Sequence, residues 1–376
     1  MKISEMLERE DFYTILEQTL SNHRHVIHAT DAPIKVVPVG VGCSMFVNSR
    51  LNAILSIHPS KAVKDYLKTE YNVSGSLQRR LAVKGYLWTS INFINKFAHK
   101  GIEVQFDKGA NQDDILIYPC NKKIRLFDFN KGIVYSMLKF NFPSLYIDRE
   151  IEFRLTHKES FIPQIEKTGN DYYSEKIING VPLARINDLS FAESCKEKAY
   201  KLLMQLTKTD EIVNAQQYIN SLKWNCLDQL KRKKIFLDSS IIDCIYDSLL
   251  TVEPTEQISL VISHGDLQPG NIWWDEDRKQ IVIIDWETVK KRSRFYDHAA
   301  LYYNLRREGT KQQVIERIKN SSHIASYTPQ CSPISIAKIV MAEELAYQTE
   351  ELISFPGEIG IKEYNQVIEQ FKTLKI

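Results

Sequence analysis

The chain has 376 residues, with 49 Lys or Arg and 47 Asp or Glu, so its formal net charge at pH 7 is +2. Hydrophobic residues make up 43% and charged residues 26%, a composition that is typical of a folded globular protein and excludes a disordered one. The balanced charge excludes a strongly basic binding protein, so we expect no nucleic-acid or membrane-surface partner. The length is sufficient for two or three domains.

Cysteine usage and the N-terminus both indicate a cytoplasmic protein. The six cysteines are scattered and none form a C-x-x-C pair, which argues against a zinc site and against a disulfide framework. The N-terminal stretch MKISEMLEREDFYTILEQ is charged and has no signal-peptide core. The apolar run at 36–47 is too short for a bilayer span, which needs about 20 residues, so we expect no membrane insertion.

The first 110 residues predict mixed structure. Helical periodicity is present at 4–21, 60–69 and 76–99, and the strand-like run VVPVGV begins at residue 36. We interpret residues 1–110 as an N-terminal extension with α/β character.

Short strands dominate the sequence from residue 113. Three β-rich runs separated by Asn-containing turns predict an antiparallel meander: DDILIYP at 113–119, KKIRLFDF at 122–129 and GIVYSMLK at 132–139. A helix is predicted at 147–158, and two further strands at 161–167 and 172–178. We expect residues 111–180 to form a β-rich unit with one helix.

The remainder of the chain is mainly helical in pattern. Apolar residues recur at helical spacing between 188 and 250 and again between 297 and 376. The sequence therefore predicts an α+β fold with a small antiparallel sheet unit and a larger helical unit at 181–376.

One motif interrupts the helical region and carries the chemistry. HGDLQPGN at 264–271 is followed by the apolar run IVIIDWE at 281–287. Asp266 and Asn271 have the spacing of the Asp and Asn in a kinase catalytic loop. Asp266 can orient or deprotonate an attacking hydroxyl, whereas Asn271 and Asp285 offer oxygen ligands to magnesium.

HGDLQPGN together with IIDWE resembles the aminoglycoside phosphotransferase and choline kinase family, a branch of the protein-kinase-like fold. The segment FYDHAAL at 295–301 is also similar, and by this resemblance Asp297 caps its helix and braces the catalytic loop. The resemblance is specific from about 260 to 305, looser from 113 to 186, and does not extend to residues 1–110.

The resemblance implies a two-lobed kinase-like fold in which 111–180 binds the nucleotide and 181–376 carries the catalytic loop and the acceptor site. It implies an ATP- and magnesium-dependent phosphotransferase that transfers the γ-phosphate to a small-molecule hydroxyl. The acceptor would be a sugar, an amino-sugar, an aminoglycoside or a choline-like molecule.

A kinase-like site needs a lysine on the third strand to hold the phosphates and a helix glutamate to orient that lysine. Lys139 ends the third predicted strand, and Glu150 lies on the helix that follows. Lys122 and Lys131, on turns, are the competing candidates for Lys139.

The connector SEKIING at 174–180 is expected to contact adenine through backbone groups, so Glu175 and Ile177 are candidates. The loop PCNKK at 119–123 contains no glycine, so its backbone cannot approach phosphates as a Gly-rich loop does. Lysine side chains such as Lys122 or Lys123 would have to cover the phosphates. We interpret the glycines at 40–42 as a strand-end turn.

Two features suggest opposite charges for the acceptor. The basic residues after Asp285 suit an anionic acceptor, although a solvated loop is the simpler interpretation. They are Lys290, Lys291, Arg292 and Arg294, and the acidic Glu287 lies in the same stretch. The helical face with Glu343, Tyr347 and Glu350 suits a cation, although a solvated helix face is the simpler interpretation. The charge of the acceptor therefore stays open.

Two alternatives stand beside the small-molecule kinase. Protein kinases that are regulated by activation-loop phosphorylation place Arg before the catalytic Asp, and Gly265 cannot serve in that way. A protein kinase is therefore disfavoured. The other alternative is a catalytically inactive nucleotide-binding or scaffold protein on the same fold.

Overall fold

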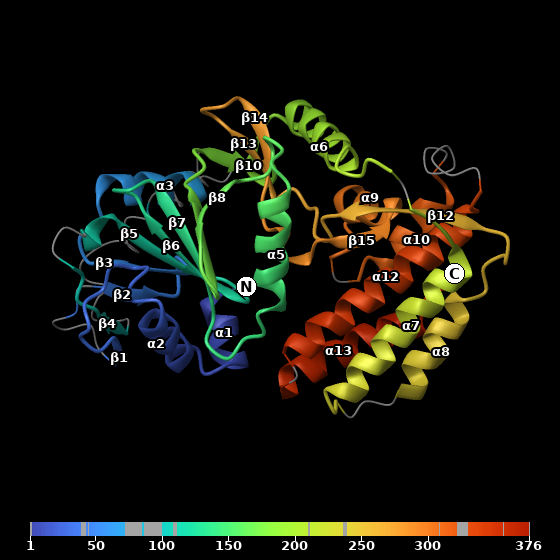
Figure 1. Cartoon of the computed structure of the whole chain (residues 1–376), viewed down its shortest axis with the longest axis horizontal. Coiled ribbons are helices and arrows are strands. Elements are labelled where there is room, and N and C mark those ends of the chain that lie inside the picture. The colour runs from blue at the N-terminus through green and yellow to red at the C-terminus, as the bar shows by residue number, and fades with distance from the viewer. Residues whose placement is uncertain are drawn as a thin grey trace. The chain divides into compact units, whose positions relative to one another are not determined.

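The computed structural model describes residues 2–38, 43, 45–71, 85, 100–107, 111–209, 211–235, 239–307, 309–321, 330–355 and 357–375 (Figure 1). The chain divides into two compact units. The sheet unit comprises Met1–Ala192 and Trp273–Ile284, and the helical unit comprises Glu193–Ile272 and Asp285–Ile376. This organisation confirms the expected α+β fold with an antiparallel sheet unit and a helical unit.

The sheet unit is built on one antiparallel sheet of nine strands, in the order β1-β4-β2-β3-β5-β6-β7-β9-β8. The expected meander is confirmed, since β5, β6 and β7 pair in sequence order. The strand bounds are β1 Lys35–Val37, β2 Met45–Asn48, β3 Ala53–Ser56, β4 Gly101–Glu103, β5 Ile115–Pro119, β6 Lys123–Asp128, β7 Ile133–Leu138, β8 Ile165–Thr168 and β9 Tyr172–Lys176.

The sheet continues across residue 110. Strand β3 pairs with β5 through Ile54↔Ile117 and Leu55↔Leu116, so β1–β4 extend the meander into a wider sheet. The N-terminal extension expected at 1–110 thus pairs directly with the β-rich unit, because the backbone groups of β5 find partners in β3. At the other edge, β8 has a register shift between Ile165 and Lys167, and most of the strand is exposed.

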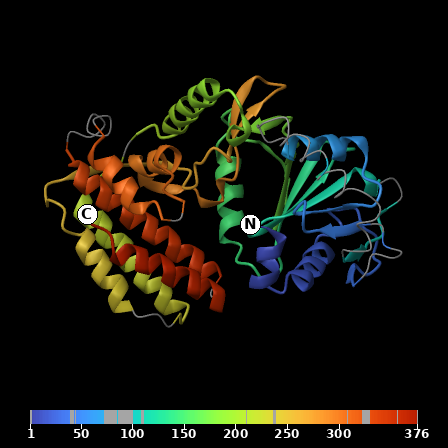
Figure 2. The ribbon, with the colours of Figure 1, turned by 180° about the vertical axis from the view of Figure 1, so that it is seen from behind.

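Helices cover both faces of this sheet (Figures 1 and 2). On one face α1 (Ile3–Arg9) and α2 (Phe12–Asn22) pack in a core that includes Ile117, Leu126 and Met137. On the opposite face α3 (Lys61–Tyr71) packs in a core that includes Leu116, Phe127 and Val134. The helix α5 (Leu145–Thr156) joins this second face through Ile147, which clusters with Leu138 and Tyr173. The strand alternation of period two accounts for this division.

The single helix expected at 4–21 is two helices, with a break at Glu10. Glu10 leaves the helical conformation, and its carboxylate pairs with Lys139. The helix expected at 76–99 lies outside the described residues except for Gly85, and the turn at 40–42 lies outside them as well.

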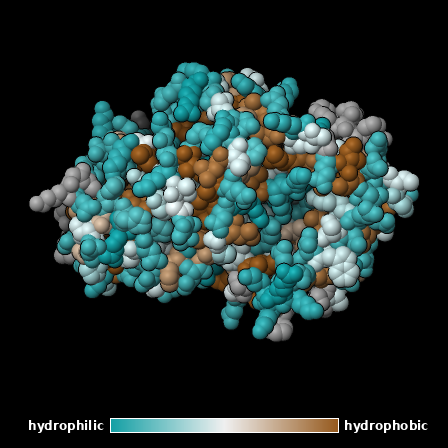
Figure 3. Space-filling model, in the orientation of Figure 1, coloured by the Kyte–Doolittle hydropathy of each residue, from teal (hydrophilic) through white to brown (hydrophobic). Residues whose placement is uncertain are grey.

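Four helices of the helical unit run side by side in both views of the ribbon: α7 Ala215–Arg232, α8 Ser239–Leu249, α12 Pro333–Ser354 and α13 Glu358–Lys372. They share one core with α9 (Arg294–Tyr303) and α10 (Lys311–Lys319). The helix α6 (Leu189–Met204) precedes them. None of the described helices is long and apolar enough to cross a membrane. Hydrophilic residues cover most of the face drawn in Figure 3.

Two small sheets flank the catalytic motif. Strands β11 (Glu211–Asn214), β12 (Gln257–Ser263) and β15 (Lys290–Ser293) form one of them, and β12 leads directly into HGDLQPGN. Strands β10 (Gly180–Pro182), β13 (Ile272–Asp275) and β14 (Gln280–Ile283) form the other. The motif therefore begins at the end of one buried strand, and its apolar run forms another.

Deleting the first 110 residues should prevent folding of the sheet unit. Strand β5 would lose its partner β3, and the core on the α1/α2 face would lose both helices, exposing a strand edge and an apolar surface. We expect a 111–376 fragment to be insoluble or to show no cooperative thermal transition by circular dichroism, with the full chain as control. A monomeric fragment that melts cooperatively would contradict this account.

Candidate active site

The catalytic loop makes a sharp turn at Gly265. This residue has φ = +83°, and a Cβ there would lie 2.4 Å from Nη1 of Arg292 and 2.7 Å from the carbonyl oxygen of Thr288. Only glycine fits this conformation in this space without displacement. The absence of an arginine at this position therefore has a steric cause within the helical unit.

Asp297 anchors the loop at its first two residues. Its two carboxylate oxygens accept hydrogen bonds from the backbone N–H groups of His264 and Gly265, each at 2.9 Å. Asp297 lies in the first turn of α9 and is 1% exposed. The bracing role expected for Asp297 is confirmed, because two buried amides have this carboxylate as their acceptor.

Asp266 and Asn271 meet within the loop. The side-chain amide of Asn271 donates to the backbone oxygen of Asp266 at 2.9 Å and to its Oδ2 at 3.1 Å. Gln268 donates to the same Oδ2 at 3.1 Å. Because the amide nitrogen of Asn271 faces Asp266, its amide oxygen is directed away from that carboxylate, as a metal ligand requires.

The environment of Asp266 shifts its acidity. Burial raises the pKa of Asp266 to about 6, the positive charge of Arg306 opposes this, and the negative charge of Asp285 adds to it. Arg306 donates to the carbonyl of Gly265 and lies 3.2 Å from the ring centroid of Tyr347. Asp266 is thus ionised at neutral pH but basic enough to accept a proton.

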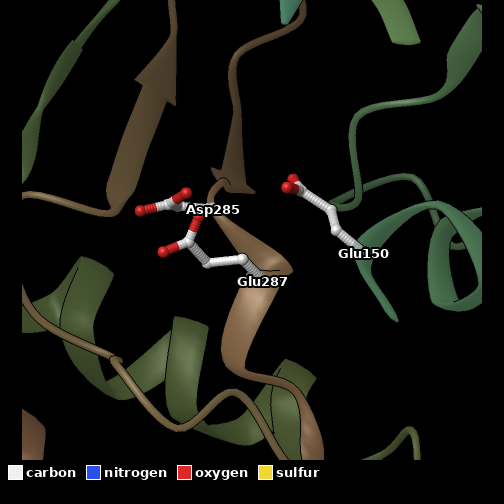
Figure 4. Close-up of side chains that lie close together, drawn as sticks. All are labelled: Glu150, Asp285 and Glu287. Carbon is white, nitrogen blue, oxygen red and sulfur yellow. The ribbon is translucent and has the colours of Figure 1, made fainter. Parts of the chain in front are cut away.

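Asp285 follows the buried strand β14 in an unusual backbone conformation. It has φ = +67°, which is uncommon for a residue with a side chain, and it opens the short helix η4 (Trp286–Thr288) above the fully buried Trp286. Glu287 lies two residues further on, and one carboxylate oxygen of each lies within 4.8 Å of the other. Figure 4 shows both side chains, and it also labels Glu150, which belongs to the sheet unit.

The donor set of the helical unit fits a hard divalent cation. Two carboxylates and one amide oxygen, from Asp285, Glu287 and Asn271, are the ligand types that magnesium takes. Sequence analysis grouped Glu287 with the acceptor residues and did not consider it as a ligand. The signal was the D-x-E spacing in IIDWE, which places two carboxylates on one turn.

The lysine that pairs with Glu150 is Lys123, so the expected pairing of Lys139 with Glu150 is wrong. Lys123 Nζ lies 2.8 Å from Glu150 Oε2, and both side chains are buried. Lys139 Nζ lies 2.5 Å from Glu10 Oε1, and burial lowers the pKa of Lys139. Lys123 lies opposite Leu138 in the sheet, so its neighbour Lys139 points to the other face.

The Lys123–Glu150 pair is part of a buried charge network on the sheet unit. Glu150 also accepts hydrogen bonds from Arg154 at 3.1 Å and from the hydroxyl of Tyr173 at 3.0 Å. Arg154 continues to the carboxylate of Glu175, which also accepts from Arg125 at 2.9 Å. The side chain of Glu175 therefore neutralises two arginines, a role that the sequence did not indicate.

Ile177 was expected to present its backbone to adenine. Its N–H instead donates to the carbonyl of Gly132 at 2.9 Å, which extends the ladder between β7 and β9. This donor is therefore used inside the sheet unit, because the strand pairing persists one residue past β9.

The two groups of residues suggested for the acceptor have structural partners inside the helical unit. Lys290 pairs with Glu350 at 3.2 Å, and Lys291 pairs with Glu211 at 2.6 Å. Arg292 is 1% exposed and donates to the Ser263 hydroxyl and the Thr288 carbonyl, so it supports the loop from inside.

The face with Glu343 and Tyr347 is equally internal. Glu343 accepts from the backbone N–H and the hydroxyl of Ser293, and burial raises the pKa of this carboxyl. Tyr347 lies beneath Arg306. Helix α12 is therefore not the solvated face that the spacing suggested.

The sequence did not indicate a cavity that lies in the helical unit. It has a volume of ≈ 1010 Å³ and lies between α6 and α9, with Tyr200, His298 and Tyr302 among its aromatic lining residues. The ring centroids of Tyr200 and His298 are 5.4 Å apart, and those of His298 and Tyr302 are 4.7 Å apart. Their long sequence separation gave no signal.

The substitution Asp266→Asn should stabilise the fold when no divalent cation is present. The pKa of Asp266 rises from 3.8 to about 6 on folding, so proton binding favours the folded state and ionisation costs stability. Wild-type stability should fall relative to the variant as pH rises from about 4 to 6, reaching a difference of about 2–3 kcal/mol at pH 7.5. Urea unfolding of the wild type and the variant at about pH 4 and at pH 7.5 measures this difference. Equal stability of the two proteins at pH 7.5 would contradict the prediction.

Comparison with known proteins gives one family match. Residues 202–329 match the model of the phosphotransferase enzyme family. Among curated protein sequences, no relative matches the chain.

Among solved structures, the ternary complex of streptomycin, ATP and APH(2")-IIa is 16% identical with a TM-score of 0.45, covering 68% of this chain and 90% of that one. Plasmodium vivax ethanolamine kinase is 13% identical with a TM-score of 0.45, covering 83% and 95%. Choline kinase from Cryptosporidium parvum is 15% identical with a TM-score of 0.38, covering 70% and 90%. At these TM-scores the likeness carries no argument about activity.

Proposed function

We propose, from the premise that residues 202–329 belong to the phosphotransferase enzyme family, that this chain is a small-molecule kinase. It transfers the γ-phosphate of ATP to a hydroxyl group and uses magnesium. The observation that carries the proposal is the braced loop itself. Asn271 donates a hydrogen bond to Asp266, and Asp297 fixes the loop that carries both residues.

Asp266 acts on the acceptor hydroxyl. Its carboxylate is ionised at neutral pH and has a pKa of about 6, so it can accept the hydroxyl proton as the oxygen attacks phosphorus. The hydrogen bonds from Gln268 and Asn271 fix one of its oxygens and so orient the carboxylate.

Asn271, Asp285 and Glu287 would hold magnesium, because together they supply only oxygen donors and two negative charges. When bound, magnesium neutralises charge on the phosphate groups. Asp285 has a left-handed backbone and the next residue, Trp286, is fully buried, so the backbone that carries this carboxylate is anchored in the core.

Lys123 replaces Lys139 as the proposed phosphate-binding lysine. It is positioned by Glu150, whose other hydrogen bonds come from Arg154 and Tyr173. Lys122, in the same glycine-free loop, lies 3.5 Å from the ring centroid of Tyr146 and is buried. We therefore propose that Lys123 is the lysine that binds the phosphates in place of a Gly-rich loop.

The acceptor is proposed to be a sugar, an amino-sugar or aminoglycoside, or a choline-like molecule, by analogy with the family. A cavity of ≈ 1010 Å³ on α9, the helix that carries Asp297, has the size of a small-molecule site and supports an acceptor of this class. We propose a cytoplasmic enzyme with no nucleic-acid partner.

Phosphoryl transfer tests the proposal directly. The full chain is incubated with magnesium, ATP and a panel of sugars, amino-sugars, aminoglycosides and amino alcohols, and products are read by mass spectrometry. We expect at least one phosphorylated product. The Asp266→Asn variant should form this product at least about 100-fold more slowly than the parent chain. No product across the panel, with nucleotide still bound, would favour the inactive nucleotide-binding alternative.

The substitution Lys123→Met should weaken magnesium-ATP binding by roughly 1.5–3 kcal/mol, because it removes a charged hydrogen-bond donor to phosphate. Lys139→Met is the matched control, since Lys139 is equally buried but pairs with Glu10 on the other face of the sheet. Calorimetry compares the two dissociation constants. A larger loss in Lys139→Met would restore the original assignment.

A further inference from the structure

A very small pocket lies on the α3/α5 face of the sheet unit, beside the connector. Its volume is ≈ 30 Å³, and its walls include Val134 on β7, Glu175 and Lys176 at the end of β9, and Ile178 beyond it. Such a volume holds about one water molecule. A purine base is several times larger, so the pocket in this conformation does not admit one.

A tyrosine from the N-terminal part of the chain forms one wall of this pocket. Tyr66 lies on α3, and its ring centroid is 5.2 Å from that of Phe127, 5.3 Å from Phe129 and 6.4 Å from Tyr118. Burial raises the pKa of Tyr66 and of Tyr118. The rings thus form one packed aromatic cluster, in which Tyr66 is the member supplied by a helix and not by the sheet.

The helix that carries Tyr66 is attached to the segment after the connector. Glu70 accepts two hydrogen bonds from Arg185, each at 2.6 Å, in a bidentate pair. Arg185 lies in the short helix η3 (Leu183–Arg185), directly after β10. On the next residue of α3, the hydroxyl of Tyr71 donates to the carbonyl of Leu51. These contacts tie the C-terminal end of α3 to η3 and to Leu51.

We propose that α3 gates the nucleotide-base site. Tyr66 must leave the aromatic cluster before a base enters beside Glu175 and Ile178, and the Glu70–Arg185 pair holds the closed state. The identity of the ligand rests on the proposed function. If only a fraction of the molecules is open, the apparent affinity for nucleotide is reduced by that fraction. Residues 61–71 thereby gain a role in donor binding.

The test compares magnesium-ATP and adenosine binding by calorimetry in the full chain, in Tyr66→Ala and in Tyr66→Phe. Tyr13→Ala is the matched control, because Tyr13 is a partly buried tyrosine on α2 at the other face of the sheet. We expect Tyr66→Ala to bind both ligands at least 5-fold more tightly than the parent chain. Tyr66→Phe, which keeps the ring, and Tyr13→Ala should bind like the parent.

Equal or weaker binding by Tyr66→Ala would overturn the gate, and so would failure of every variant to bind. Thermal melting of each variant confirms that it is folded. Glu70→Gln provides a second route, since it weakens the pair with Arg185 without opening space in the aromatic cluster, and it should also tighten binding. Unchanged affinity in that variant would remove the closing role of the pair.

The outcome is separable from the proposed function. Turnover by the parent chain with no affinity difference in Tyr66→Ala would overturn the gate and leave the phosphotransferase intact. The expected affinity difference without any phosphorylated product would support the gate and overturn the phosphotransferase.

Discussion

Two hydrogen bonds to one carboxylate determine the geometry of the catalytic loop. Asp297 accepts the N–H groups of His264 and Gly265, which are consecutive in the chain, so both amides must point toward α9. With those amides fixed, Gly265 is forced into a left-handed conformation over Arg292. Asp266 then follows in a half-buried position, where Asn271 can reach both its backbone and its side chain.

The same arrangement places destabilising features at the residues that the proposed chemistry uses. Asp266 is a half-buried carboxylate with a raised pKa, and Asp285 adopts a left-handed backbone that a residue with a side chain seldom takes. Such features persist only when the contacts of the surrounding structure stabilise the fold by more than these features destabilise it. Here the buried Trp286, the Asp297 hydrogen bonds and the packed helical core provide that support.

The local features of the site were predictable from the sequence, whereas several partners were not. The loop, its brace and the meander follow from short motifs and from period-two alternation. Lys139 was paired with Glu150 because it ends the third strand, yet the same alternation places Lys123 on the face of α5. Strand register had to be known before that choice could be made.

Long-range pairing explains the other differences. Strands β2 and β3 each have only four residues, and their sequences gave no clear strand pattern. They pair with each other in a hairpin, and β4 and β5, which lie far away in the chain, join this hairpin to the rest of the sheet. The acceptor interpretations differed for a related reason. Glu343 and Lys290 look like solvent-facing charges by spacing, but Ser293 and Glu350 are their partners in the fold.

The continuation of the sheet across residue 110 has a consequence for how the protein behaves in a crowded solution. A meander that ended at β5 would present the unpaired N–H and C=O groups of a strand with apolar side chains, ILIYP, to other chains. Such edges promote aggregation. In the nine-stranded order, the terminal positions fall to β1, with three residues, and to β8, with the sequence IEKT and a bulge. Short, charged and irregular strands make poor templates for another strand, so the added strands protect the β-rich unit from self-association.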